Sequence, residues 1–290
     1  MITGSVVALV TPMLESGGVD WRGLERLIDW HIDSGTDVIS LVGTTGEAST
    51  LSHEEHREVI RIGVAHAGGR IPIMAGTGSN STTEAIELTV AAAEAGADSG
   101  LIVTPYYNRP TQEGMFQHFK AIAASVNLPI ILYNVPSRTA SDLSNETVLR
   151  LSQIENIVGL KDATGDVARA RDLMALLPDG FGVYSGDDAT TCDLLAAGAH
   201  GCISVTANIC PADMALMCKM ALSGNIDEAR RADERLQPLH RDLFLEPNPV
   251  PAKYALGTMG LIKDFVRLPL IRLSAEHEET VKQAVAQCKS

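Results

Sequence analysis

Short apolar runs alternate with amphipathic stretches along most of the chain. Eight of the runs have the length of a buried strand, and a stretch with helical spacing of apolar residues follows nearly every one. The expected strands are 6–9, 38–42, 71–75, 100–103, 130–133, 157–161, 181–185 and 201–204. Their near-continuous apolar character is typical of parallel strands that are covered on both faces.

Helix signals fall between these strands. Residues 20–34 place apolar side chains on one helical face, and Ser52 with Glu55 and Ser81 with Glu84 each predict a capping box that opens a helix. Further helices are expected over 112–126, from 144, from 167 and up to 197, and every segment from 213 onward has a helical pattern. The last of these are expected over 226–243, 251–259 and 275–287.

The strand ends recur at about the spacing of one βα unit. Eight such units predict an α/β fold, a (β/α)8 TIM barrel with a C-terminal helical extension. A doubly wound open sheet is the structural alternative. We assign residues 1–224 to the barrel catalytic domain and 225–290 to a C-terminal helical region suited to subunit contacts.

Composition narrows the class of protein. The chain has 290 residues, 45% of them hydrophobic, and a net charge of −13, so nucleic acid and anionic membranes are not expected partners. Neither a signal peptide nor a membrane span is expected. The five cysteines form no Cys-x-x-Cys pair and are interpreted as reduced core thiols of a cytoplasmic protein, neither disulfide-bonded nor zinc-binding. No metal and no cofactor is expected.

The strand at 157–161 ends in a lysine, Lys161. A lysine there can simply extend its head into solvent while its stem packs. In barrel enzymes, however, active sites lie at the C-terminal ends of the strands. The polar or positioning residues expected at those ends are Thr44, Thr45, Tyr106, Tyr107, Tyr133, Arg138, Lys161, Gly186, Asp187, Ile203 and Ser204.

This set predicts Schiff-base chemistry. A partly desolvated lysine amine attacks carbonyls, and the resulting iminium allows a neighbouring proton to leave. Tyr133, at the end of the adjacent strand, is placed to shuttle that proton, and Thr44 can extend a hydroxyl relay. Backbone N–H groups of 43–46 can bind a small carboxylate, and Arg138 a second one. The implied reaction is an aldol-type condensation or cleavage of a keto acid. Acidic residues at 187–188 argue against a sugar phosphate.

Three motifs carry a family resemblance: Gly-Thr-Thr-Gly-Glu at 43–47, Tyr-Asn-Val-Pro at 133–136 with Arg138 and Thr139, and Gly-Leu-Lys-Asp at 159–162. Together they resemble the class I pyruvate-dependent aldolases, and within these the dihydrodipicolinate synthase family. The resemblance implies condensation of pyruvate with L-aspartate 4-semialdehyde to 4-hydroxy-tetrahydrodipicolinate, in lysine and diaminopimelate biosynthesis. It also implies a homotetramer made of two tight dimers.

The resemblance assigns roles residue by residue. Lys161 is implied as the Schiff-base lysine and Tyr133 as the proton donor and acceptor, with Thr44 and Tyr107 in the proton relay. Tyr107 would come from a neighbouring subunit. Thr45 and Ile203 are implied as the residues that bind pyruvate, and Arg138 as the residue that binds the semialdehyde carboxylate. Gly186 is also expected to be a substrate-binding residue. Two departures from the family pattern, the order Ala48-Ser49 and Ser137 before the arginine, remove no catalytic group.

Regulated members of the family bind L-lysine as an effector at the tight dimer interface. The matching positions are Ser49, His53, His56, Asn80, Glu84 and Tyr106. Alternatives are that Glu84 only caps a helix, that the histidines are ordinary surface residues, or that they bind a metal, for which His-x-x-His alone is weak.

Two other functions stay open at this point. One is another Schiff-base pyruvate aldolase, such as N-acetylneuraminate lyase or a keto-deoxy-sugar aldolase. The other is a non-catalytic barrel that binds a small molecule, which would not need the full set of lysine, tyrosine and threonines.

Overall fold

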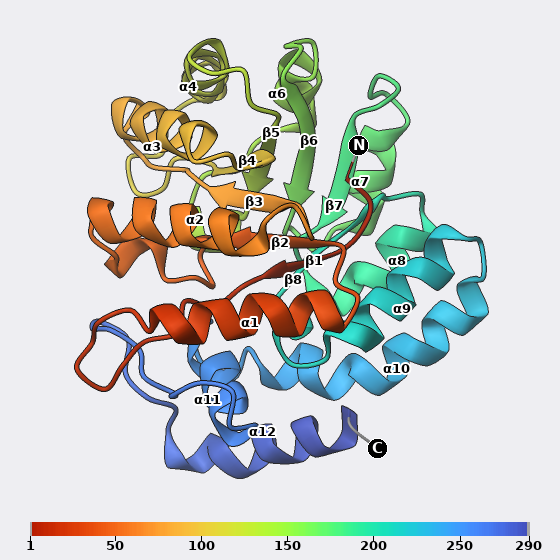
Figure 1. Ribbon diagram of the computed structural model, residues 1–290. Helices are drawn as coiled ribbons and strands as arrows, with labels where there is room; N and C mark the ends of the chain where they lie inside the picture. The colour runs from red at the N-terminus through yellow and green to blue at the C-terminus, as the bar shows by residue number, and fades with distance from the viewer. Residues whose placement is uncertain (1, 289–290) are drawn as a thin grey trace.

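Eight parallel strands close into a barrel in the order of the chain, in a computed structural model that describes residues 2–288 (Figure 1). The strands are β1 (Gly4–Ala8), β2 (Val38–Leu41), β3 (Ile73–Gly76), β4 (Ser99–Val103), β5 (Ile130–Asn134), β6 (Ile157–Asp162), β7 (Gly182–Ser185) and β8 (Gly201–Ser204). β1 pairs with β8 and closes the sheet. The predicted TIM barrel is confirmed, and the doubly wound alternative is wrong.

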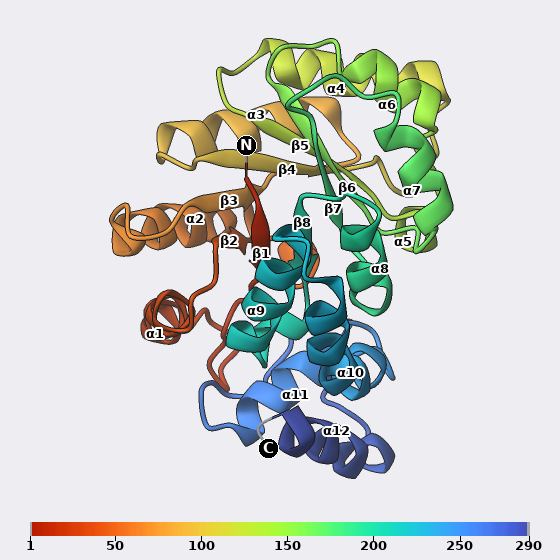
Figure 2. The ribbon, with the colours of Figure 1, turned by 90° about the vertical axis from the view of Figure 1, so that its right-hand side faces the viewer.

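Helices surround the strands, and the C-terminal helices gather at one side of the barrel (Figures 1 and 2). The α-helices are α1 (Trp21–Asp33), α2 (His53–Ala67), α3 (Thr82–Glu94), α4 (Gln112–Ala124), α5 (Pro136–Thr139), α6 (Asn145–Leu151), α7 (Val167–Met174), α8 (Thr191–Ala196), α9 (Pro211–Leu222), α10 (Ile226–Asp242), α11 (Val250–Thr258) and α12 (Ala275–Cys288). Three 3-10 turns are η1 (Ala48–Thr50), η2 (Asp188–Thr190) and η3 (Thr206–Asn208). The short helix α5 was not predicted.

One of the two predicted capping boxes is present. Ser52 and Glu55 bond each other's backbone N–H groups at the start of α2. At α3 the Ser81 hydroxyl accepts the Glu84 N–H, but the Glu84 carboxylate turns away toward the Ser79 hydroxyl. The prediction of a capping box at α3 is therefore wrong, because a nearby serine and histidine offer Glu84 other partners.

The apolar core has an inner and an outer layer. Side chains such as Val6, Met74 and Ile131 fill the barrel, while a larger set lies between strands and helices. The outer set also includes Leu236 of α10 and Val281 of α12. The C-terminal helices thus share the core of the barrel, and the division at 224/225 remains a prediction.

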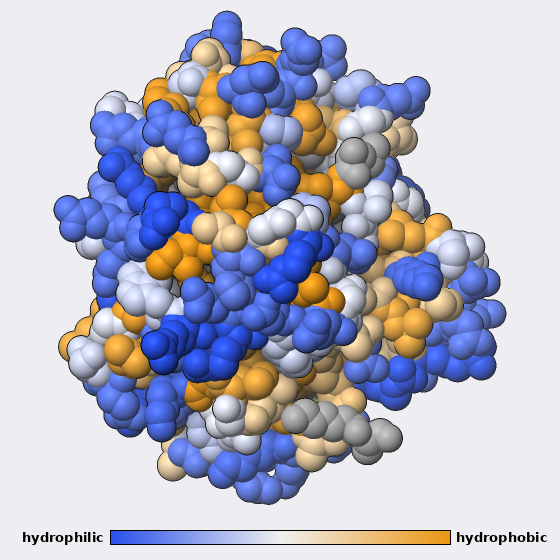
Figure 3. Space-filling model, viewed as in Figure 1, coloured by the Kyte–Doolittle hydropathy of each residue, from blue (hydrophilic) through white to orange (hydrophobic). Residues whose placement is uncertain are grey.

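The outer helices are amphipathic, as α1 illustrates. Leu24, Leu27 and Ile28 are buried against the sheet, whereas the opposite side of α1 forms part of a largely hydrophilic face (Figure 3). Within residues 2–288, no helix combines the length and the hydropathy that a bilayer-spanning segment needs.

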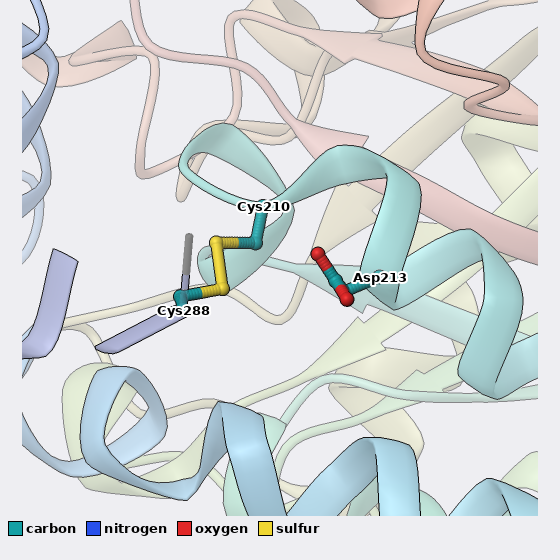
Figure 4. A group of neighbouring side chains, drawn as sticks. All are labelled: Cys210, Asp213 and Cys288. Carbon is teal, nitrogen blue, oxygen red and sulfur yellow. A yellow bond between two sulfur atoms is a disulfide. The ribbon is translucent and has the colours of Figure 1, made fainter. Parts of the chain in front are cut away.

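The prediction that all five cysteines are reduced is wrong for two of them. Cys210, which precedes α9, is bonded to Cys288 at the end of α12, 78 residues away in sequence (Figure 4). Asp213 lies beside this disulfide. Both sulfurs are used in the disulfide and are not thiolate ligands in this form. Cys192, Cys202 and Cys218 are free and buried, as expected.

Buried histidines predict a pH dependence of stability. Burial lowers the pKa of His31 to about 3 and the pKa values of His56 and His118 to about 4, from an ordinary 6.5. Between pH 6.5 and 4 the unfolded chain therefore binds more protons than the folded chain, so stability is expected to fall as pH falls. The limiting slope is about 1.4 kcal/mol per pH unit for each histidine.

Urea unfolding at pH 7.5, 6 and 5 measures this slope. It should become shallower in His31→Asn, which removes one of the three histidines whose pKa burial lowers. A free energy of unfolding that is constant over this range would contradict the prediction.

Candidate active site

Lys161 and Tyr133 lie side by side inside the mouth of the barrel. They are register partners on the adjacent parallel strands β6 and β5, so their side chains point to the same side of the sheet. The Lys161 Nζ lies 4.1 Å from the centroid of the Tyr133 ring. Lys161 is only 6% exposed and Tyr133 7%. The solvent-exposed alternative for Lys161 is therefore wrong.

Gly186 directly follows β7 and has no side chain, so that there is room for the side chain of Lys161. A Cβ at position 186 would lie 2.8 Å from the Lys161 Cε and 2.8 Å from the Ala163 Cβ. Both distances are shorter than side chains tolerate, and the lysine stem is the more mobile of the two neighbours. Gly186 thus acts on the lysine by packing against it.

Gly186→Ala is expected to push the Lys161 amine aside and to lower kcat by about 10²-fold, the effect of a misplacement of about 1 Å. Reductive trapping of a keto acid on Lys161 should slow in parallel, while the melting temperature changes little. Gly18→Ala is the control, because its added Cβ would meet only the Ser16 hydroxyl, at 3.8 Å. Unchanged trapping in Gly186→Ala would show that the amine does not need this space.

The loop after β2 carries the predicted threonine pair. Thr45 is buried, and its hydroxyl oxygen accepts a hydrogen bond from the Asn248 amide at 2.9 Å, which leaves the hydroxyl proton free to donate. Within residues 2–288, the backbone N–H groups of Thr44 and Thr45 donate to no acceptor of the chain. Free N–H groups at a tight turn suit a small carboxylate.

A cavity of about 550 Å³ opens beside this loop. It joins two groups of predicted residues: Thr44, Tyr133 and Arg138 of the candidate active site, and Ser49, His53, His56, Glu84 and Tyr106 of the candidate effector site. Arg138 is exposed on α5, where its guanidinium can meet a second anionic group. Lys161, Thr45, Gly186 and Ile203 do not line this cavity; Ile203 is part of the apolar layer inside the barrel.

Tyr107 is placed apart from the other candidate catalytic residues. It is 89% exposed, on a backbone turn with φ 72°, and does not reach the cavity of its own chain. Asn80 also lies outside the cavity lining, and its amide donates to the Tyr106 carbonyl.

The candidate effector residues surround an acidic group. The Glu84 carboxylate contacts the His53 Nε2 at 2.6 Å and accepts the Ser79 hydroxyl at 2.5 Å. His56 is buried, and burial keeps it neutral by lowering its pKa to about 4. Glu84 therefore presents a carboxylate at the cavity wall, which is suited to an ammonium group. The alternative that it only caps a helix is wrong.

The loops after β7 and β8 do not form a phosphate site. Asp187 caps η2 by accepting the Thr190 N–H, and the Asp188 carboxylate accepts the N–H groups of Val205 and Thr206 at 3.0 and 2.8 Å. The backbone donors that a phosphate would need at β8 are thus already satisfied by a side chain.

Sequence reasoning missed Asn248, Lys253 and Arg267, which contact the loop after β2 from more than 200 residues away. Lys253 forms a buried ion pair with Glu47. The one sequence signal was Lys253, which stands in the apolar stretch 250–256, since a charge is rarely buried without a partner.

Comparison with known proteins gives a consistent result. The model of the dihydrodipicolinate synthetase family matches residues 1–288. A 4-hydroxy-tetrahydrodipicolinate synthase from Nitrosomonas eutropha is 58% identical over 99% of this chain and 98% of its own. The dihydrodipicolinate synthase from Acinetobacter baumannii complexed with pyruvate is 55% identical, with a TM-score of 0.98 over 100% of this chain and 99% of that one.

A third similar structure, from Cyanidioschyzon merolae with lysine bound, is 38% identical, with a TM-score of 0.96 over 99% of this chain and 98% of that chain. The closed barrel, the lysine at its mouth and the sequence similarity to these synthases together define a Schiff-base-forming lyase. The chain belongs to the dihydrodipicolinate synthetase family.

Proposed function

We propose that this protein condenses pyruvate with L-aspartate 4-semialdehyde to 4-hydroxy-tetrahydrodipicolinate, in lysine and diaminopimelate biosynthesis. Family membership supports this reaction. The observation that carries the mechanism is the contact between Lys161 and Tyr133 at the mouth of the barrel. The biosynthetic role favours a cytoplasmic location. The Cys210–Cys288 disulfide does not contribute to this assignment, because reduced cysteines are what a cytoplasmic protein is expected to have.

The proposed mechanism starts with the Lys161 amine, which attacks the keto carbon of pyruvate and releases water to form an iminium. The N–H groups of Thr44 and Thr45 bind the pyruvate carboxylate. Tyr133 takes a methyl proton, relayed through Thr44 and a partner subunit's tyrosine equivalent to Tyr107, and the enamine forms. Its carbon attacks the aldehyde carbon of the second substrate, whose carboxylate is held by Arg138; the aldehyde oxygen takes up the relayed proton to become a hydroxyl, and the enamine returns to the iminium. The amino group of that substrate then displaces Lys161, closes the ring and frees the amine.

Substrate comparison tests the reaction. Turnover is expected with pyruvate plus aspartate semialdehyde and not with N-acetylneuraminate or keto-deoxy sugars. Turnover of a sugar acid alone would favour the other aldolases. Absence of any borohydride-trapped pyruvate adduct would contradict every Schiff-base mechanism and would leave the non-catalytic binding barrel.

The proposal includes regulation by L-lysine at the outer part of the cavity. Glu84 would bind an ammonium group there, with Ser49, His53, His56 and Tyr106 around it. Asn80 would support this site from outside the cavity lining, through its hydrogen bond to the Tyr106 carbonyl. Lysine titration of the wild type and of Glu84→Ala tests this site: inhibition in the first and its loss in the second are expected. If L-lysine does not inhibit the wild type, the proposal of an effector site is contradicted.

The proposal also includes a homotetramer made of two tight dimers. The exposure of Tyr107 supports it, because a relay tyrosine on the surface can act only in another subunit. Sedimentation equilibrium measures the mass. A fully active monomer would contradict the role of Tyr107.

A further inference from the structure

The loop that carries Thr44 and Thr45 is tied to the C-terminal part of the chain by buried charges. We propose that the Glu47–Lys253 ion pair is a positioning device for the reaction, which holds this loop so that both threonines stay at the mouth of the barrel. The inference rests on the proposed function. Neither residue touches the substrates in this arrangement; they act through the loop.

Glu47 and Lys253 are withdrawn from water almost completely. Their side chains are 1% and 0% exposed, and the Lys253 Nζ donates to the Glu47 Oε1. The ammonium also donates to the Phe265 carbonyl at 2.9 Å, and the second Glu47 oxygen accepts the Arg267 backbone N–H at 3.2 Å. Both charges are therefore satisfied by fixed partners.

The loop held by this ion pair has an unfavourable backbone conformation at two residues. Val42 and Glu47, at its two ends, have φ values of 48° and 56°, in the left-handed region that non-glycine residues rarely adopt and that is least favourable for a β-branched side chain. Residues in this region persist only where the surrounding structure holds them.

Other contacts brace the same loop. The Thr11 hydroxyl donates to the Gly46 carbonyl at 2.7 Å, and a Cβ on Gly46 would lie 2.9 Å from the Val42 Cα, so the two ends of the loop touch. The Arg267 guanidinium bonds the Thr50 carbonyl at 2.8 Å and both carboxylate oxygens of Glu55 at 2.6 Å. The next turn of the chain is thus held by the same C-terminal segment.

Stability alone does not account for a buried ion pair. Replacing one by well-packed apolar residues of similar volume is often neutral or stabilising, because the desolvation of two charges offsets their attraction. What neutral residues do not reproduce is the directional hold on Glu47. Glu47 lies two residues from Thr45 and three from Thr44, so any drift of its backbone moves the proposed pyruvate-binding N–H groups.

The test removes both charges at once. In Glu47→Gln/Lys253→Met the volumes are kept and the glutamine oxygen can still accept the Arg267 N–H. We expect a folded protein with a melting temperature close to that of the wild type, a kcat lowered by about 10–100-fold, and a raised KM for pyruvate. The rate of borohydride-trapped adduct formation on Lys161 should fall at low pyruvate and recover at saturating pyruvate.

The matched control is Glu278→Gln/Lys282→Met, the same substitutions in a half-exposed pair on α12 with a 3.7 Å contact, where a glutamine can still accept the Tyr254 hydroxyl; its kinetics should be unchanged. A folded Glu47→Gln/Lys253→Met variant with wild-type kcat and KM would overturn the proposal. If that variant does not fold, Glu47→Asp keeps the charge and shortens its reach by one methylene. It should lower kcat at a nearly unchanged melting temperature, and wild-type kinetics there would also overturn the proposal.

The rate of adduct formation with pyruvate separates this inference from the function on which it rests. It needs no second substrate, so a wild type that traps pyruvate without turning over aspartate semialdehyde would contradict the proposed reaction. The effect of the ion pair on pyruvate binding would still be measured.

Discussion

Lys161→Met abolishes the pyruvate adduct and lowers kcat by about 10³-fold or more, because the covalent intermediate has no other amine to form on. The only other buried lysine among the described residues, Lys253 of α11, is held by Glu47 and by the Phe265 carbonyl. Mass spectrometry after borohydride reduction in the presence of pyruvate detects the adduct on the wild type and its absence in the variant.

Lys161→Arg provides the matched control, because it keeps the positive charge but offers no nucleophilic amine at neutral pH. It should be as inactive as the methionine variant. An Arg variant with substantial activity would mean that Lys161 acts by its charge, and that the Schiff base forms elsewhere or not at all.

Tyr133→Phe is expected to lower kcat by about 10²–10⁴-fold, the usual contribution of a positioned general acid or base. The ring that lies against Lys161 remains, so packing and the pyruvate adduct should be kept. The step that should fail is proton removal from the methyl carbon. Exchange of pyruvate methyl protons with deuterated water, followed by NMR, measures that step directly.

Tyr184→Phe is the control for this substitution. Tyr184 also lies in the barrel interior, but its hydroxyl donates to the Ile2 carbonyl, and burial raises its pKa to about 12. Its loss should lower stability by about 1 kcal/mol and leave exchange intact. Equal loss of exchange in both variants would show that removal of any barrel hydroxyl disturbs the site, and would withdraw the proton-shuttle role from Tyr133.

The barrel and its central pair could be predicted from the sequence because both depend on local pattern. Apolar runs of strand length fixed the eight strands, and consecutive strands of a parallel barrel are neighbours, so Tyr133 and Lys161 had to meet if both ended their strands on the same face. The register pairs these two residues directly.

What could not be predicted depends on contacts between distant parts of the chain. Cys210 and Cys288 are 78 residues apart, and Glu47 and Lys253 are 206 apart. Neither pairing can be recognised from a periodic pattern in the sequence. Glu84 was misread for a related reason: its spacing from Ser81 fits a capping box, but His53 from the preceding helix competes for the carboxylate. Local spacing cannot reveal a competitor from another element.

The dependence of the Thr44–Thr45 loop on Lys253 and Arg267 has a consequence for synthesis of the protein on the ribosome. All eight strands precede residue 205, yet the counter-ion of Glu47 is translated almost fifty residues later. A nascent chain that has completed its eight strands would still carry Glu47 without its counter-ion beside the Thr44–Thr45 loop. Competence for the reaction would therefore be acquired late, at about the time the last helices leave the exit tunnel.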